Sequence, residues 1–151
     1  MSVSETTVQN LIQRSCLTLD NNDYDGYLGL LSDGMRYRVV AYSEELRKEM
    51  VWLDHDQGEM KHLFKMLPKH VTLQGSFFGH VVPCSIQLGD QGWRAISSLM
   101  LVHTDLDGNS KLMAVGRYHD EFIEQSDQLR LARREVRLET RVLGPGLHVP
   151  I

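Results

Sequence analysis

The spacing of apolar residues along this chain changes once, and the change predicts two structural regions. Over most of the first 67 residues, apolar side chains recur every three or four positions, which is the spacing of one helix face. From Gly79 onward they recur mainly every second position, which is the spacing of a half-buried strand. The sequence therefore predicts helices in the first region and an antiparallel sheet in the second.

The first region predicts helices over about residues 4–32 and 44–67, with a strand over about 35–42 between them. Ser4 suits the cap of the first helix, and Asp23 suits the cap of a short helix that follows it. The stretch "MRYRVVAY" between the helical regions is rich in residues that favour strands. We expect the second helical region to be broken at "DHDQG" and to end at the proline that follows it.

The second region predicts strands over about residues 79–143. The stretch "DLDGNS" has the composition of a hairpin turn, and so does "SDQ" further on. Residues 99–102 are apolar on both faces, which predicts a strand covered from both sides. The last residues, 144–151, are nearly uncharged and predict a tail that docks on the protein. The whole chain, residues 1–151, then forms one α+β domain in which the N-terminal helices cover a curled antiparallel sheet, a cone-shaped half-barrel.

Strand parity assigns the charged residues near the end of the chain to faces. His119 and Asp120 are adjacent, so they point to opposite faces and cannot form a local catalytic pair. The apolar parity changes between Leu131 and Val136, which predicts a β-bulge near residues 133–134. Arginines alternate with glutamates here, so we expect ion pairs between strands or a polar protein interface.

Composition narrows the functional classes. The chain has a net charge of −4 and a pI near 5.9, which does not favour nucleic-acid binding. It has no apolar run long enough for a membrane span and no signal-like start, so we expect a cytoplasmic protein. Its two cysteines, Cys16 and Cys84, are then expected as reduced core residues.

Motifs of common catalytic sites are missing from the sequence. It has no phosphate-binding glycine loop, no nucleophile elbow, and no histidine or cysteine cluster with zinc spacing. One enzymatic interpretation stays open: a pocket inside the cone with a single general base. The candidates are Asp120, His80 and His103, and for each of them a hydrogen-bonded structural role is the commoner one.

Four stretches together resemble one known family, the small (beta) subunits of Rieske-type ring-hydroxylating oxygenases, which have the nuclear transport factor 2-like fold. The stretches are "LDNNDYDGYLGLLSDGMRYRV", "WLDHDQGEMKHLFKML", "GRYHDEF" and "LRLARREVRLE". The small subunits of aromatic-ring dioxygenases are often rich in arginine after the acidic segment in the second of these stretches. The corresponding segment here, "MKHLFKMLPKHVTLQGSFFGHVV", is poor in arginine. This departure counts against a ring substrate of the biphenyl or naphthalene kind and leaves room for an atypical branch, such as the one that contains the methanesulfonate monooxygenases.

The resemblance implies a structural subunit without a catalytic centre, metal or cofactor of its own. Such subunits form a trimer and support three large (alpha) subunits, which hold the Rieske 2Fe–2S cluster and the mononuclear Fe(II). Electrons reach the large subunit from NADH through a reductase, and an aromatic or small organic acid is hydroxylated. Rieske ligation needs paired Cys and His motifs, and this chain has none. The nominees for subunit contacts are Arg117, Arg133, Arg134 and Arg137.

Two alternatives stay open beside this interpretation. A stand-alone dehydratase or isomerase of the same fold would use a pocket Asp or His as its base. A ligand-binding or scaffold protein of this fold would have no oxygenase partner. An enclosed pocket that converges on Asp120 would favour the first alternative.

Overall fold

The computed structural model describes residues 2–70, 74–141 and 150–151. Its elements are α1 (Glu5–Asp20), α2 (Tyr24–Leu28), β1 (Leu31–Ser43), β2 (Lys48–Asp56), α3 (Gln57–His70), β3 (Ser76–Gly89), β4 (Gly92–Thr104), β5 (Ser110–Gln125) and β6 (Gln128–Leu138). The strands form one curled sheet in the order β2-β1-β6-β5-β4-β3. Neighbouring strands are antiparallel except β1 and β6, which are parallel.

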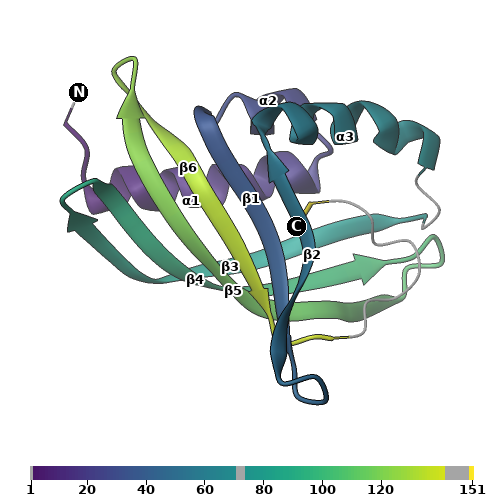
Figure 1. The fold of residues 1–151 in the computed structure, drawn as a ribbon. Helices are drawn as coiled ribbons and strands as arrows, with labels where there is room; N and C mark the ends of the chain where they lie inside the picture. Colours follow the sequence, from purple (N-terminus) through teal and green to yellow (C-terminus); the bar gives the residue numbers. More distant parts are fainter. Residues whose placement is uncertain (1, 71–73, 142–149) are drawn as a thin grey trace.

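The helices cover the concave face of this sheet, as Figure 1 shows. Helix α1 lies across the sheet and buries Val8, Ile12 and Cys16 against it. Helix α3 packs over β1 and β2, and α2 joins it there through contacts of Tyr24 and Tyr27 with Phe64. The predicted α+β fold, a helix-covered half-barrel, is therefore confirmed.

The predicted helix starts agree with the structure. Ser4 caps α1, and its side chain and that of Thr7 each accept a hydrogen bond from the other residue's backbone N–H, as in a capping box. Asp23 caps α2 by accepting from the Gly26 N–H at 2.9 Å. Within the described residues, no helix is both long and apolar enough to cross a membrane.

The prediction of a helix over the first half of residues 44–67 is wrong. Residues 48–56 form strand β2, which pairs with β1 along its whole length. Tertiary pairing overrides the local pattern here, because the free edge of β1 offers backbone partners that a helix could not use. The predicted break at "DHDQG" is the junction of β2 and α3, and α3 runs to His70, two residues beyond the proline expected to stop it.

Strand β3 also departs from the prediction that both cysteines lie in the core. Cys16 is buried, but Cys84 is exposed, and so are Val82 and Leu88. The pairing of β3 with β4 shifts between Pro83 and Ser85, so Cys84 is the extra residue of a β-bulge. Simple alternation cannot hold through such a bulge.

Strands β5 and β6 follow the predicted alternation closely. Gly116, Tyr118, Asp120 and Phe122 are buried on one face of β5. The pairing of β5 with β6 shifts by one residue: Glu121 lies opposite Arg133, and Phe122 lies opposite Leu131. Ala132 is therefore the extra residue of a bulge in β6. The predicted bulge beside residues 133–134 is thus confirmed.

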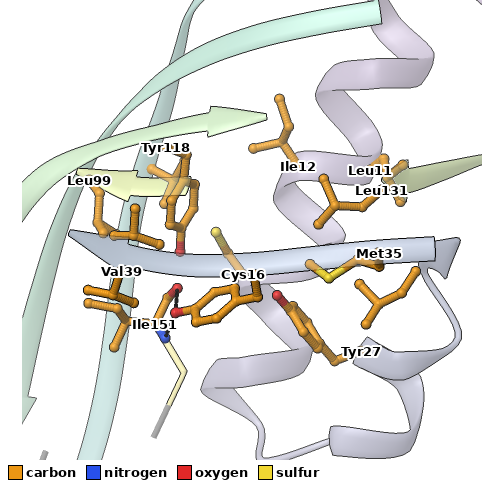
Figure 2. Packing of buried hydrophobic residues seen from close by; sticks show 14 of the residues in the cluster. Leu11, Ile12, Cys16, Tyr27, Met35, Val39, Leu99, Tyr118, Leu131 and Ile151 are labelled. Atoms are coloured by element: carbon orange, nitrogen blue, oxygen red, sulfur yellow. Dashed lines mark hydrogen bonds between the residues drawn. The ribbon is translucent and has the colours of Figure 1, made fainter. Parts of the chain in front are cut away.

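The end of the chain returns to the core. Most of the predicted docking tail, residues 144–149, lies outside the described residues, whereas Pro150 and Ile151 are buried. The Tyr37 hydroxyl donates to the Ile151 backbone oxygen at 3.0 Å and accepts from its N–H at 2.9 Å. Figure 2 shows this contact within the core, together with the side chains of Cys16 and Tyr118.

Candidate functional site

A fully enclosed ion pair lies between the sheet and α1. Both oxygens of Asp120 on β5 accept hydrogen bonds from Arg134 on β6, from Nε at 2.8 Å and from Nη2 at 2.9 Å. Both side chains have 0% exposure. The third guanidinium nitrogen, Nη1, donates to the Ser15 hydroxyl of α1 at 2.9 Å. The pair is brought together by the β5–β6 register, in which Asp120 and Arg134 are direct partners.

The surroundings favour the charged form of Arg134. The Tyr118 ring lies under the guanidinium of Arg134, 3.9 Å from ring centre to carbon, so its π-face also meets the cation. Burial disfavours the charged form of Arg134, but the Asp120 carboxylate outweighs burial and raises the pKa of the guanidinium above its usual value. The Ser15 hydroxyl donates in turn to the Ile12 carbonyl at 2.6 Å, which completes the network.

The three candidates for a pocket base do not converge. Asp120 has both oxygens occupied by Arg134, so neither is available to take a proton from a substrate. His103 is buried, and its Nε2 lies 2.8 Å from the Gln74 carbonyl. His80 is exposed on β3. Asp120 pairs with Ala95 on β4, and His103 lies eight residues further along the same strand. His103 and Asp120 are therefore separated by roughly 25 Å along the strand direction.

A partly open cavity does exist, on the same side of the sheet as α1. It has a volume of about 260 Å³ and lies between α1, β3, β4 and the end of the chain. Tyr118 lines it, but Asp120 does not. Asp20, at the C-terminal end of α1, is its acidic group: burial raises the pKa of Asp20, and a hydrogen bond from the Gly79 N–H partly offsets the rise.

The outer face of β1, β2 and β6 carries a network of arginines and carboxylates. Glu135 is its centre and accepts hydrogen bonds from Arg38, Arg133 and Arg137. Burial disfavours the charged form of Glu135, but the three arginines prevail and lower its pKa. Arg137 also reaches Glu49 at 2.8 Å. The predicted ion pairs between strands are confirmed on this face.

The outer face of β3, β4 and β5 is apolar instead. Phe78 is 58% exposed and Met100 43% exposed, and Val82 and Leu112 are exposed beside them. Phe78 and Leu112 lie in one row across the strands, because both are opposite Val102, and Met100 lies in the next row, opposite His80 and Val115. Residues 99–102 were predicted to be covered on both sides. Leu99 and Leu101 are buried, but within this single chain Met100 is not covered. We call Phe78, Val82, Met100 and Leu112 the outer apolar patch.

The four arginines nominated for subunit contacts lie in different places. Arg117 is exposed on β5 opposite Ser98, next to the outer apolar patch. Arg133 and Arg137 are about half exposed and belong to the network around Glu135. Arg134 has no exposed surface, so it has nothing to offer a neighbouring chain.

Sequence reasoning missed the partners of these residues. Arg134 has the parity of Val136 and Leu138, which was a signal that it points inward beyond the bulge. Nothing in the sequence indicated that Ser15 would complete the ion pair or that Asp20 would line a cavity. In the part of the chain that the structure describes, no group of three or more His, Cys, Asp or Glu side chains could hold a metal ion.

Comparison with known proteins identifies the family. The family model of the ring hydroxylating beta subunit matches residues 14–144. The chain is 32% identical to the methanesulfonate monooxygenase hydroxylase subunit beta of Methylosulfonomonas methylovora, over 95% of this chain and 85% of that protein. It is 30% identical to the 2-aminobenzenesulfonate 2,3-dioxygenase subunit beta of an Alcaligenes species, over 88% of this chain and 89% of that protein.

A solved structure agrees with these relatives. The beta subunit of a putative aromatic-ring-hydroxylating dioxygenase from Novosphingobium aromaticivorans superposes with a TM-score of 0.79 at 22% identity, covering 97% of this chain and 95% of that one. The fold, the order of elements and the sequence relatives agree. The chain therefore belongs to the ring-hydroxylating beta subunit family, the small subunits of multicomponent oxygenases.

Proposed function

We propose that this chain is a non-catalytic, structural small subunit that supports the large (alpha) subunit of a Rieske non-haem iron oxygenase. The observation that carries the proposal is the outer apolar patch, because its four large side chains are exposed in the single chain. Several large apolar side chains exposed on one face of a sheet favour a protein interface. The occupied carboxylate of Asp120 supports the non-catalytic part of the proposal, since it is not available as a base.

The assembly we propose has three small and three large chains, with the small chains forming a trimer. Arg117, Arg133 and Arg137 are the proposed contact residues, because their guanidinium groups are exposed beside the patch or within the outer network. Arginine suits such positions because it can hold carboxylates of a neighbour with two hydrogen bonds. Arg134 is left out of this set because it is buried.

The chemistry belongs to the large subunit in this proposal. That subunit would hold the Rieske 2Fe–2S cluster and the mononuclear iron, and a reductase would deliver electrons from NADH, with the complex in the cytoplasm. The substrate class we propose is a small organic sulfonate. Both curated relatives are named for sulfonates, one aliphatic and one aromatic.

Two measurements test this function. The mass of the purified chain by light scattering should be that of a trimer, and co-expression with its large chain should give equal numbers of both. The co-purified complex should then consume oxygen in the presence of NADH, reductase and methanesulfonate or 2-aminobenzenesulfonate. A monomer that ignores the large chain would overturn the structural role, and activity only on non-sulfonated rings would overturn the substrate class.

A pair of matched variants locates the interface. Phe78→Asp places a charge in the outer apolar patch, whereas Leu17→Asp places one on the outward side of α1, where Leu17 is 60% exposed. We expect the first variant to lose the trimer or the large chain and the second to keep both. If the two variants assemble equally well, the patch is not the interface.

A further inference from the structure

The cavity inside the cone has apolar walls over most of its surface. Six of its lining residues, drawn from α1, α3, β3, β4 and the end of the chain, are large and apolar: Leu19, Leu67, Phe77, Leu99, Leu101 and Ile151. A dry cavity of about 150 Å³ lined in this way is enough for benzene. The 260 Å³ found here is enough for a ring with a short substituent.

Two polar groups at the cavity are suited to hold a ligand. The Asp20 carboxylate accepts from the Gly79 N–H through Oδ1 at 2.9 Å, and its Oδ2 has no hydrogen bond within the described residues. The Tyr118 side chain is 2% exposed, and no hydrogen bond of its hydroxyl is found in the described part of the chain. Because Tyr118 lines the cavity, its hydroxyl is placed to donate to or accept from a polar atom of a ligand.

The charge of the cavity decides which ligands fit. Among the described residues that line the cavity, Asp20 is the only charged side chain, and none of them is a lysine or an arginine. An anion would meet a carboxylate with no cation to offset it. A neutral hydroxyl group would instead donate to Asp20 Oδ2 and accept from the Tyr118 hydroxyl, while its ring fills the apolar part.

We infer that this cavity is a binding site for a small neutral aromatic alcohol, held by Asp20 and Tyr118. This preference for a neutral alcohol is opposite to the preference for sulfonates proposed for the assembled enzyme. The inference does not depend on the assembly, because every group in it comes from one chain. A failure of either proposal therefore leaves the other to be judged by its own measurement.

The first test is binding of 4-ethylphenol to the full chain, by calorimetry and by the NMR shift of the Gly79 amide. We expect saturable one-to-one binding that moves the Gly79 signal, because this N–H donates to the same carboxylate. The anion 4-ethylbenzenesulfonate should not bind at matched concentrations. Absence of phenol binding, or equal binding of the sulfonate, would overturn the inference.

Variants then separate the site from the rest of the surface. Leu19→Trp fills the cavity, whereas Leu17→Trp adds the same ring on the exposed side of the same helix. We expect the phenol affinity to fall about tenfold or more in the first and to change less than about twofold in the second. Equal affinities in these two variants would place the ligand elsewhere.

Conservative changes test the two polar groups without disturbing the core. Asp20→Asn keeps the acceptor for the Gly79 N–H and replaces the free acceptor by a donor, so the affinity should fall about tenfold. Tyr118→Phe should lower it about threefold, because a neutral hydrogen bond is weaker. If neither change alters the affinity, the alcohol is not held by these groups.

Discussion

The two faces of the sheet use arginine–carboxylate pairs in opposite ways, and β6 shows both at consecutive residues. Arg134 points into the concave face and meets one carboxylate, Asp120, and neither side chain has exposed surface. Glu135 points to the convex face and meets three arginines, of which Arg133 and Arg137 remain nearly half exposed. The inner pair consists of two charged side chains without exposed surface. In the outer network several arginines share one carboxylate, and two of them are partly exposed to solvent.

The difference indicates separate roles for the two faces. A charge inside a dry core depends on its one partner, so the loss of that partner leaves an uncompensated buried ion. Arg133 and Arg137 on the outer network are in contact with water and share their partner Glu135 with other arginines, so the loss of either arginine costs little stability. The inner pair therefore fixes how α1, β5 and β6 fit together, and the outer arginines are available to a neighbouring chain.

The largest effect is expected from breaking the inner pair. Arg134→Met leaves Asp120 buried without its partner and should lower the free energy of unfolding by about 3 to 5 kcal/mol. Urea unfolding measures this loss. The control is Arg94→Met, which removes an exposed arginine 3.7 Å from Glu121 and should change stability by less than about 1 kcal/mol.

A double variant distinguishes pairing from packing at this site. Asp120→Leu combined with Arg134→Met removes both charges and should recover part of the loss seen in the single variant, because no ion is left unpaired. If the double variant is less stable than Arg134→Met alone, the shape of the guanidinium against Tyr118 and Ser15 matters more than its charge.

The next largest effect on stability is expected at Gly116, where β5 and β6 approach each other closely. A Cβ added at Gly116 would overlap the backbone oxygen of Arg137 and would lie 2.9 Å from Leu138 Cα. Both separations are shorter than those that real Cβ atoms show. Gly116→Ala must push the two strands apart and should cost about 2 to 3 kcal/mol in thermal or urea unfolding. Gly34→Ala is the control, because a Cβ there meets nothing within 4 Å. Equal stability of the two variants would show that the strands yield easily.

A smaller effect is expected where the end of the chain meets β1. Tyr37→Phe removes both hydrogen bonds to Ile151 and leaves buried backbone groups without a partner. The expected loss is about 1 to 2 kcal/mol, together with faster hydrogen exchange of the Ile151 amide. Tyr42→Phe, at a half-exposed tyrosine of the same strand, should change neither quantity.

These contrasts also explain what the sequence could predict. The period of two assigned Asp120 and His119 to opposite faces of β5, and the change of parity located the bulge before Arg134. Both are local rules, and both hold in the structure. The helix caps at Ser4 and Asp23 are local in the same sense. Local rules therefore predicted the fold class well.

What failed depends on residues far apart in the chain. Strand β2 exists because β1 offers it an edge, and no pattern within residues 48–56 reveals that edge. Arg134 was nominated for subunit contacts because arginines that make two hydrogen bonds are favoured where subunits meet. Its two hydrogen bonds go instead to Asp120 within the same chain, and the hydroxyl of Ser15 completes an enclosed site. The cavity at Asp20 likewise requires α1, β3 and the end of the chain to meet.

The smallest effect on stability is expected from the outer network, and this effect depends on pH. Glu135 has a lowered pKa, so its contribution is present above the pKa of an unfolded glutamate, about 4.3, and is lost as the pH falls through the folded value. Glu135→Gln should therefore cost up to about 1 kcal/mol at pH 7 and progressively less below about pH 4.

Urea unfolding of this variant and the native chain at pH 7 and pH 3.5 measures the difference at each pH. Glu124→Gln is the control, since Glu124 is exposed and no ion pair of it occurs in the described ranges. A loss at pH 7 as large as that of Arg134→Met would remove the contrast between the two faces. A small, pH-dependent loss joined to weaker association with the large chain would sharpen it, because the outer charges would then act mainly between chains and the inner pair within one.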